Sequence, residues 1–181
     1  MTFKRFTIYD LIIIAVMAAA GIAIKPVVSS VVHIVSTPLG IPGGSLAGGL
    51  YMMWLVLAFA ITGKYGSATL AALVQAVIVM LTGTGHGVMS LFSYGIPGLA
   101  VDLLMFILLF LCRRNFDRLS SFFAGMVANL AGTLIVNFMF FKNPSLIFVL
   151  MILSAALSGG VGGLIAWELY RVIKKYKLVR R

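Results

Sequence analysis

The chain has 181 residues, of which 62% are hydrophobic and only 10% are charged, and its formal net charge is +10. Soluble domains are roughly half apolar and a quarter charged, so this composition excludes a soluble globular domain. The apolar runs are as long as membrane-spanning helices and lack the alternation of a transmembrane β-barrel. The sequence therefore predicts an all-α polytopic membrane protein, in which residues 1–181 form a single transmembrane domain.

Six apolar segments predict six transmembrane helices in a compact bundle. In chain order they cover Thr7–Ile24, Ser45–Thr62, Gly66–Thr82, Ser90–Cys112, Leu119–Phe141 and Ser145–Tyr170. The first segment follows two basic residues and ends in MAAAGIA, a pattern that a cleaved signal peptide also shows. A helix that is not cleaved inserts with the same orientation, so the topology of the remaining segments does not depend on this point.

The basic residues predict the orientation of these helices. With the N-terminus in the cytoplasm, all 14 lysines and arginines except Lys25 and Lys142 lie on the cytoplasmic side. Such an asymmetry is the positive-inside pattern of multi-pass membrane proteins. Both termini are therefore expected in the cytoplasm. The positive charge suits anionic lipid headgroups of the bilayer, and we expect no nucleic-acid partner.

Small residues recur at four-residue spacing along the first predicted helix, at Ala15, Ala19 and Ala23. Small side chains in this register form a flat stripe that lets a second helix approach closely. The stripe predicts either docking to another membrane subunit or packing inside this bundle.

The segment from Lys25 to Gly44 becomes the first external loop in this orientation. Pro38 and Pro42 disfavour continuation of a helix, and the neighbouring glycines allow sharp turns. The segment is also largely apolar, so we expect it to fold back over the outer mouth of the bundle, where protein surrounds irregular backbone. It is predicted to act as a lid. A short re-entrant packing segment without a gating role is the alternative.

Several residues of the next helices are candidates for contact with a ligand. Tyr51 and Trp54, in the outer half of the second helix, could stack on a flat ligand, although aromatic residues also collect at membrane interfaces. Gln75, midway along the third helix, could contact a ligand or bond to another helix. His86 and Tyr94 lie at the external junction of the third and fourth helices, where a histidine in a Gly-rich loop is often simply solvated.

Asp102 lies within the fourth predicted helix, one to two turns below its expected outer end. An acid inside a membrane is costly and usually faces a cavity or a partner, so a ligand-facing role is predicted. The structural alternative pairs it with Gln75, Asn137 or a backbone group. Asn129 and Asn137 share one face of the fifth helix and could contact a ligand, with interhelical hydrogen bonding as their alternative.

Enzymatic chemistry is not expected from this sequence. The stretch AFAITGKYG lacks the glycine spacing and the Ser or Thr of a phosphate-binding loop, so the chain is not an ATPase. Ser158 in ALSGGVGG lacks a base within reach, because His33 and His86 are both assigned to external loops. These two histidines also lack further ligands for a metal. We therefore expect no catalytic site, no cofactor and no metal.

Taken together, these features resemble the substrate-binding S component of energy-coupling factor (ECF) vitamin transporters, over essentially the full length. The resemblance is carried by chain length, six helices, the basic cytoplasmic side and tail, the apolar first external loop, and the motif Ala15-x-x-x-Ala19, which Ala23 extends. It implies a protein of the prokaryotic plasma membrane that binds a vitamin or related micronutrient from outside. It also implies that the first helix docks on a transmembrane coupling subunit and that two cytoplasmic ATPases supply energy.

In this family the site draws on the first loop and the outer halves of helices four to six. In this chain that region contains His33, Thr37, Tyr94, Asp102, Asn137 and Ser154. A neutral or cationic heteroaromatic, such as a thiamine precursor, would suit an acid and amides, because Asp102 could accept a hydrogen bond from an exocyclic amine. Two alternatives stay open. An autonomous secondary transporter or channel would show internal repeats or broken helices, and a membrane enzyme would show turnover.

Overall fold

The structure is a computed structural model that describes residues 6–39, 43–83, 87–108, 116–141 and 144–176. Its six α-helices are α1 (Ile8–Leu39), α2 (Gly43–Thr62), α3 (Ser67–Thr82), α4 (Ser90–Phe106), α5 (Arg118–Val136) and α6 (Ser145–Lys175). A 3₁₀ turn, η1 (Gly87–Met89), precedes α4, and a π-helical segment, η3 (Asn137–Phe141), follows α5. The described residues contain no strand, which confirms the all-α prediction.

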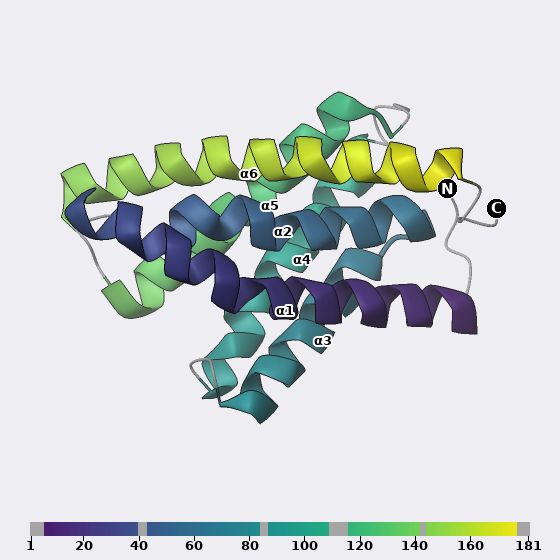
Figure 1. The fold of residues 1–181 in the computed structure, drawn as a ribbon, viewed down its shortest axis with the longest axis horizontal. Coiled ribbons are helices and arrows are strands. Elements are labelled where there is room, and N and C mark those ends of the chain that lie inside the picture. Colours follow the sequence, from purple (N-terminus) through teal and green to yellow (C-terminus); the bar gives the residue numbers. More distant parts are fainter. Residues whose placement is uncertain (1–5, 40–42, 84–86, 109–115, 142–143, 177–181) are drawn as a thin grey trace.

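Helix α1 differs from its prediction, because it continues through most of the segment expected to be an external loop. The helix reaches Leu39 and includes both Pro26 and Pro38. The hydroxyl groups of Ser29 and Ser30 each donate a hydrogen bond to the carbonyl of Pro26 at 2.9 Å. In an apolar environment an unpaired backbone group is so costly that a helix with a proline is still favoured over irregular backbone. Figure 1 shows α1 changing direction part-way along its length, as expected near an internal proline.

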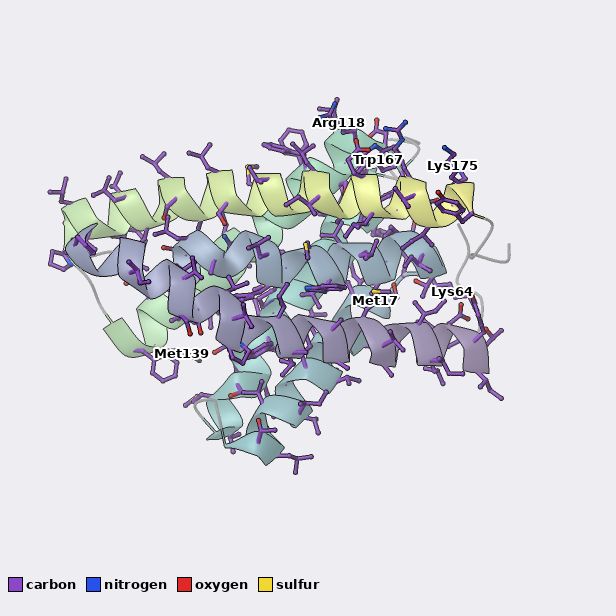
Figure 2. The ribbon with its side chains drawn as sticks, in the orientation of Figure 1. Met17, Lys64, Arg118, Met139, Trp167 and Lys175 are labelled. Atoms are coloured by element: carbon purple, nitrogen blue, oxygen red, sulfur yellow. The ribbon has the colours of Figure 1, made fainter. Side chains whose placement is uncertain are left out.

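Among the described residues, five helical stretches are long and apolar enough to cross a membrane, with η1 and α4 counted as one stretch, whereas α3, with 16 residues, is shorter. Helix α1 begins and helix α6 ends at the same end of the bundle (Figure 1). Lys64 and Lys175 lie at this end (Figure 2), which we call the basic end. It corresponds to the side predicted to be cytoplasmic.

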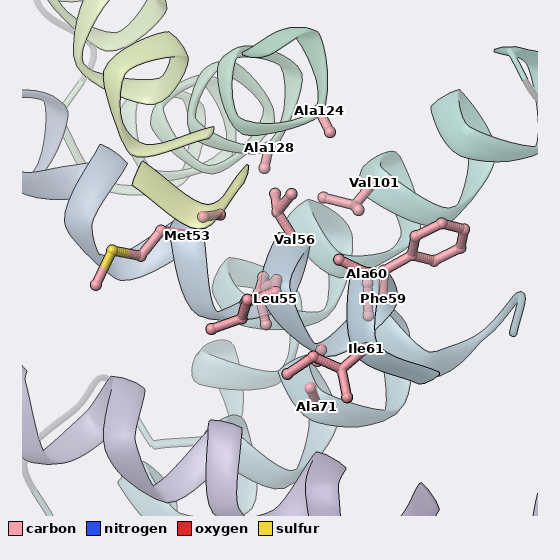
Figure 3. Packing of buried hydrophobic residues seen from close by; sticks show 14 of the residues in the cluster. Met53, Leu55, Val56, Phe59, Ala60, Ile61, Ala71, Val101, Ala124 and Ala128 are labelled. Atoms are coloured by element: carbon pink, nitrogen blue, oxygen red, sulfur yellow. The ribbon is translucent and has the colours of Figure 1, made fainter. Parts of the chain in front are cut away.

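Helix α2 forms the centre of the bundle and packs against each of the other five helices. Its residues from Leu55 to Ala60 are all buried. Figure 3 shows Val56 of α2 beside Val101 of α4 and Ala128 of α5. These small and branched side chains fill the space between three helices and fix the position of α2.

Glycines allow α2, α5 and α6 to pack at backbone distance. A Cβ atom added at Gly125 would lie 2.2 Å from the carbonyl oxygen of Gly159, and one added at Gly162 would lie 2.0 Å from that of Gly49. A side chain at either position would therefore push the helices apart. The small residues of α6 are used for packing inside the bundle, with α5 on one side and α2 on the other.

Candidate substrate-binding site

Three helices bring Gly21, Trp54 and Gln75 together near the middle of the bundle. A Cβ atom added at Gly21 of α1 would lie 2.3 Å from Nε2 of Gln75 and 3.3 Å from Cδ1 of Trp54. The side chains from α2 and α3 thus meet against the bare backbone of α1. Gln75 is only 4% exposed, so its amide is removed from solvent and lipid.

Two hydrogen-bond donors in this group have no acceptor. Both Nε1 of Trp54 and Nε2 of Gln75 are buried, and neither finds a partner among the residues that the structure describes. A buried donor without a partner costs about 1–3 kcal/mol. Most buried polar groups in proteins are paired, so two adjacent exceptions in one bundle call for a specific explanation.

A second polar group lies one helical turn away, toward the end opposite the basic end. Lys25 follows Gly21 by four residues on α1, and Tyr51 precedes Trp54 by three residues on α2, so each pair shares a helix face. The Lys25 ammonium donates a hydrogen bond to the hydroxyl of Tyr94 on α4. It also lies 4.9 Å from the centroid of the Tyr94 ring. The Tyr51 hydroxyl donates to the backbone carbonyl of Lys25 at 3.5 Å.

These two groups form one continuous set, which we call the polar column. It consists of Gly21, Lys25, Tyr51, Trp54, Gln75 and Tyr94. Four of the six, all but Gly21 and Lys25, were predicted as site residues from the sequence. Sequence reasoning missed Lys25 because its segment was expected to be a loop. Had the helix been extended, the four-residue spacing from Gly21 would have placed both on one face.

The polar column contains a cation and no carboxylate. The sequence has only four acidic residues, and the structure describes all of them. Asp10 pairs with Lys64 at 2.5 Å, Glu168 pairs with Arg171 at 3.0 Å, and Asp117 caps the start of α5. Asp102 contacts the start of α3 instead. Lys25 is therefore the one charged residue of the polar column.

The expected position of Asp102 near the outer end of its helix is wrong. Helix α4 begins at Ser90, and Asp102 lies about one turn from its other end at Phe106. Its Oδ2 accepts hydrogen bonds from the backbone N–H of Thr69 at 2.8 Å and from the Thr69 hydroxyl at 2.6 Å. These contacts match the structural alternative, in which the acid pairs with a backbone group.

The polar residues of α5 and α6 link helices. Asn129 is 2% exposed, and its Nδ2 donates to the carbonyls of Ser45 at 3.1 Å and Ala155 at 2.9 Å. Ser154 donates to the Ser45 hydroxyl at 3.2 Å. Asn137 is buried at the start of η3. For Asn129 and Ser154 the contacts fit interhelical bonding, and ligand contact stays a prediction for all three.

Three predicted site residues lie where the structure gives no side-chain information. His33 and Thr37 fall within the helical backbone of α1, but their side chains are outside the described part. His86 lies outside the described residues altogether. Their contact with a ligand stays a prediction.

The small-residue stripe of α1 faces away from the bundle. Ala15, Ala19 and Ala23 are all exposed on the surface of the chain, whereas Ile14 and Ala18 of the same helix are buried. The stripe therefore does not serve packing within the part of the chain that the structure describes. It leaves a flat apolar surface on the outside of the bundle.

Comparison with known proteins identifies the family. A family model described as "ABC-type cobalt transport system, permease component" matches residues 9–131. A solved structure titled "Crystal structure of an S-component of ECF transporter" is similar with a TM-score of 0.80 and 16% sequence identity, over 97% of this chain and 89% of that chain. No curated protein shows significant sequence similarity.

These findings confirm the resemblance to an S component that the sequence indicated. They also place the chain among transport proteins rather than enzymes. The chain has the fold of an ECF transporter S component, and it belongs to the family of permease components of ABC-type cobalt transport systems.

Proposed function

We propose that the chain is a membrane-embedded, high-affinity binding subunit that captures a small organic micronutrient in the polar column. The observation that carries the proposal is the pair of buried donors on Trp54 and Gln75, which lack an acceptor among the described residues. A ligand that supplies acceptors would remove the cost of leaving them unpaired. Tyr51 and Tyr94 add aromatic surface next to these donors, as small-molecule sites commonly do.

Delivery of this cargo would depend on a separate ATP-driven ECF module. The sequence contains no phosphate-binding loop, so the chain has no ATP-hydrolysing site of that kind. The exposed stripe at Ala15, Ala19 and Ala23 supports docking to a transmembrane coupling subunit, because it offers a flat surface that the described bundle does not use. Two cytoplasmic ATPases would complete the module in the membrane of a prokaryotic cell.

Cobalt is a second candidate cargo, because the family description names a cobalt transport system. A divalent cobalt ion would be bound by several imidazole, thiolate or carboxylate groups. Among the described residues no group of three or more His, Cys, Asp or Glu residues could hold a metal ion. Lys25 in the polar column also repels a cation. The donor chemistry of the column therefore favours an organic cargo, with a vitamin or vitamin precursor as the narrower proposal.

The proposal is tested with the purified full-length chain. Mass spectrometry of small molecules retained through purification is expected to identify one organic compound, and added cobalt is expected neither to bind nor to displace it. In liposomes, the chain alone should bind this compound without concentrating it. Accumulation should require the coupling subunit, the ATPases and ATP. Accumulation by the chain alone would contradict the proposal and favour an autonomous transporter.

A further inference from the structure

We propose that the polar column selects an uncharged or anionic ligand, which presents hydrogen-bond acceptors to Trp54 and Gln75, and that it rejects organic cations. This selectivity rests on the proposed function, because it specifies the chemistry of the same cargo. It follows from three properties of the column: the kind of polar atoms left unpaired, the charge beside them, and the positions of the acids.

The unpaired atoms are donors. An indole N–H can only donate, so Nε1 of Trp54 requires an acceptor from whatever lies against it. The Gln75 amide carries both a donor and an acceptor, and in the structure its Nε2 points to Gly21 and has no partner among the described residues. Trp54 thus requires a hydrogen-bond acceptor on the ligand, and Gln75 adds a second donor beside it. Ring nitrogens, carbonyls and carboxylates are ligand groups that satisfy both.

The charge beside these donors is positive. The Lys25 ammonium lies one helical turn from Gly21 and contacts the hydroxyl and the ring of Tyr94. It forms no ion pair with any acid, all four of which lie in the described part of the chain. In the low dielectric of a membrane bundle, a cationic ligand would be repelled more strongly than in water. An uncharged or anionic ligand avoids this cost.

The nearest acid along the column helices is already engaged elsewhere. Asp102 follows Tyr94 by eight residues on α4, which is about 12 Å along the helix axis. One carboxylate oxygen accepts two hydrogen bonds from Thr69, at the start of α3. The other oxygen, Oδ1, has no partner among the described residues. Because it belongs to the same carboxylate, it too lies at the basic end and outside the column. The column therefore lacks the carboxylate that would recognise an exocyclic ammonium or a ring cation.

A neutral heteroaromatic of the thiamine-precursor kind fits this chemistry, because its ring nitrogens accept hydrogen bonds. The cationic alternative predicted from the sequence depended on Asp102 lying near the outer mouth. With the acid at the start of α3, a cation would have no partner of opposite charge in the column. Neutral and cationic heteroaromatics therefore differ in their expected affinity for the column, and binding measurements can distinguish them.

The test uses two probes: 4-amino-2-methylpyrimidine at mildly alkaline pH, where it is uncharged, and its N-methylated pyrimidinium, which carries a positive charge and a methyl group in place of one ring-nitrogen acceptor. Equilibrium dialysis with the full-length chain in nanodiscs is expected to show at least about tenfold tighter binding of the uncharged probe. The Trp54→Phe variant, which removes one donor and keeps an aromatic ring, is expected to weaken that binding about tenfold. Trp167→Phe is the matched control, because Trp167 packs on Phe116 and Tyr170, outside the column.

The Gln75→Glu variant provides a second readout, which is a change in preference between the two probes rather than a loss of affinity. It places a carboxylate among the donors with little change of shape, so the preference should invert and the pyrimidinium should bind more tightly than the uncharged probe. Retained folding is checked by the thermal unfolding transition of each variant.

The outcome is judged on whichever small molecule the wild-type protein holds, a probe or a compound retained from cells. An uncharged or anionic molecule, held about tenfold less tightly by Trp54→Phe, supports the selectivity. A permanent cation held by the wild type overturns the selectivity and leaves the proposed function standing. Unchanged affinity in Trp54→Phe overturns both the selectivity and the placement of the cargo at these donors. If the wild type holds no small molecule at all, the proposed function itself fails.

Discussion

Asp102 of α4 caps the first turn of α3 through Thr69. Its Oδ2 accepts from the Thr69 backbone N–H at 2.8 Å and from the Thr69 hydroxyl at 2.6 Å. The residue before α3 is Gly66, which has a left-handed backbone and no side chain to cap the helix. The acid of a neighbouring helix therefore supplies the cap that the local sequence lacks, and its negative charge lies at the positive end of the α3 dipole.

Asp102→Ala is expected to lower the free energy of unfolding by about 2 kcal/mol, because it leaves the Thr69 N–H without its acceptor. Ligand affinity per folded molecule should stay unchanged, since the acid lies outside the polar column. Thermal unfolding and equilibrium binding of the same preparations measure the two effects. Thr69→Val, which removes only the hydroxyl partner, should give a smaller loss of stability. Loss of ligand binding in folded Asp102→Ala would instead restore the ligand-facing role predicted from the sequence.

Most helix positions could be predicted from the sequence, because glycines or charged residues end the apolar runs. Helices α2 and α3 match their predicted segments to within two residues, since glycines and Lys64 separate them. The segment from Lys25 to Leu39 was predicted wrongly. Two prolines and a lysine indicate a loop in soluble proteins, but in an apolar environment the backbone keeps its helical bonds despite a proline.

The candidate site could be predicted only residue by residue. Tyr51, Trp54, Gln75 and Tyr94 were each candidates, but their convergence depends on the rotation of each helix about its axis, which a single sequence does not fix. Asp102 was misplaced because α4 begins at Ser90, so the acid lies more than three turns from that end rather than the one to two turns predicted. Its partner Thr69 is distant in sequence and carries no recognisable signal of its own.

Changing both Ala15 and Ala19 to Leu should abolish assembly with the coupling subunit and leave ligand binding intact. Both alanines are exposed, so larger side chains would not disturb the packing of the described bundle but would hold a partner helix away. Co-purification with the coupling subunit measures assembly. Val16→Leu is a matched control, because Val16 is exposed on the same helix but outside the four-residue register. Normal assembly of the double variant would show that docking uses another surface.

Lys25→Met should increase the mobility of the second half of α1. The lysine side chain joins α1 to α4 through the Tyr94 hydroxyl, directly before Pro26 within the helix. Without this bond, hydrogen exchange is expected to accelerate in residues 26–38 and to stay unchanged in residues 8–24. Tyr51→Phe, which removes a longer bond to the Lys25 carbonyl at 3.5 Å, should have a smaller effect. If exchange in residues 26–38 is no faster in Lys25→Met than in the wild type, other contacts hold this segment.

Asn129→Leu should destabilise the bundle by about 1–2 kcal/mol, because it removes two interhelical hydrogen bonds and keeps a similar volume. The amide donates to carbonyls of both α2 and α6, so its loss leaves two buried acceptors at the point where three helices meet. Gly48 lies directly against this side chain, since an added Cβ would be 1.7 Å from Oδ1 of Asn129. Gly48→Ala should therefore destabilise the protein through the same contact, and the two effects should not add in the double variant. Unfolding in a graded series of denaturing detergent measures all three variants. Additive losses would show that Asn129 and Gly48 act independently, and a selective loss of ligand binding in Asn129→Leu would place this amide at the ligand instead.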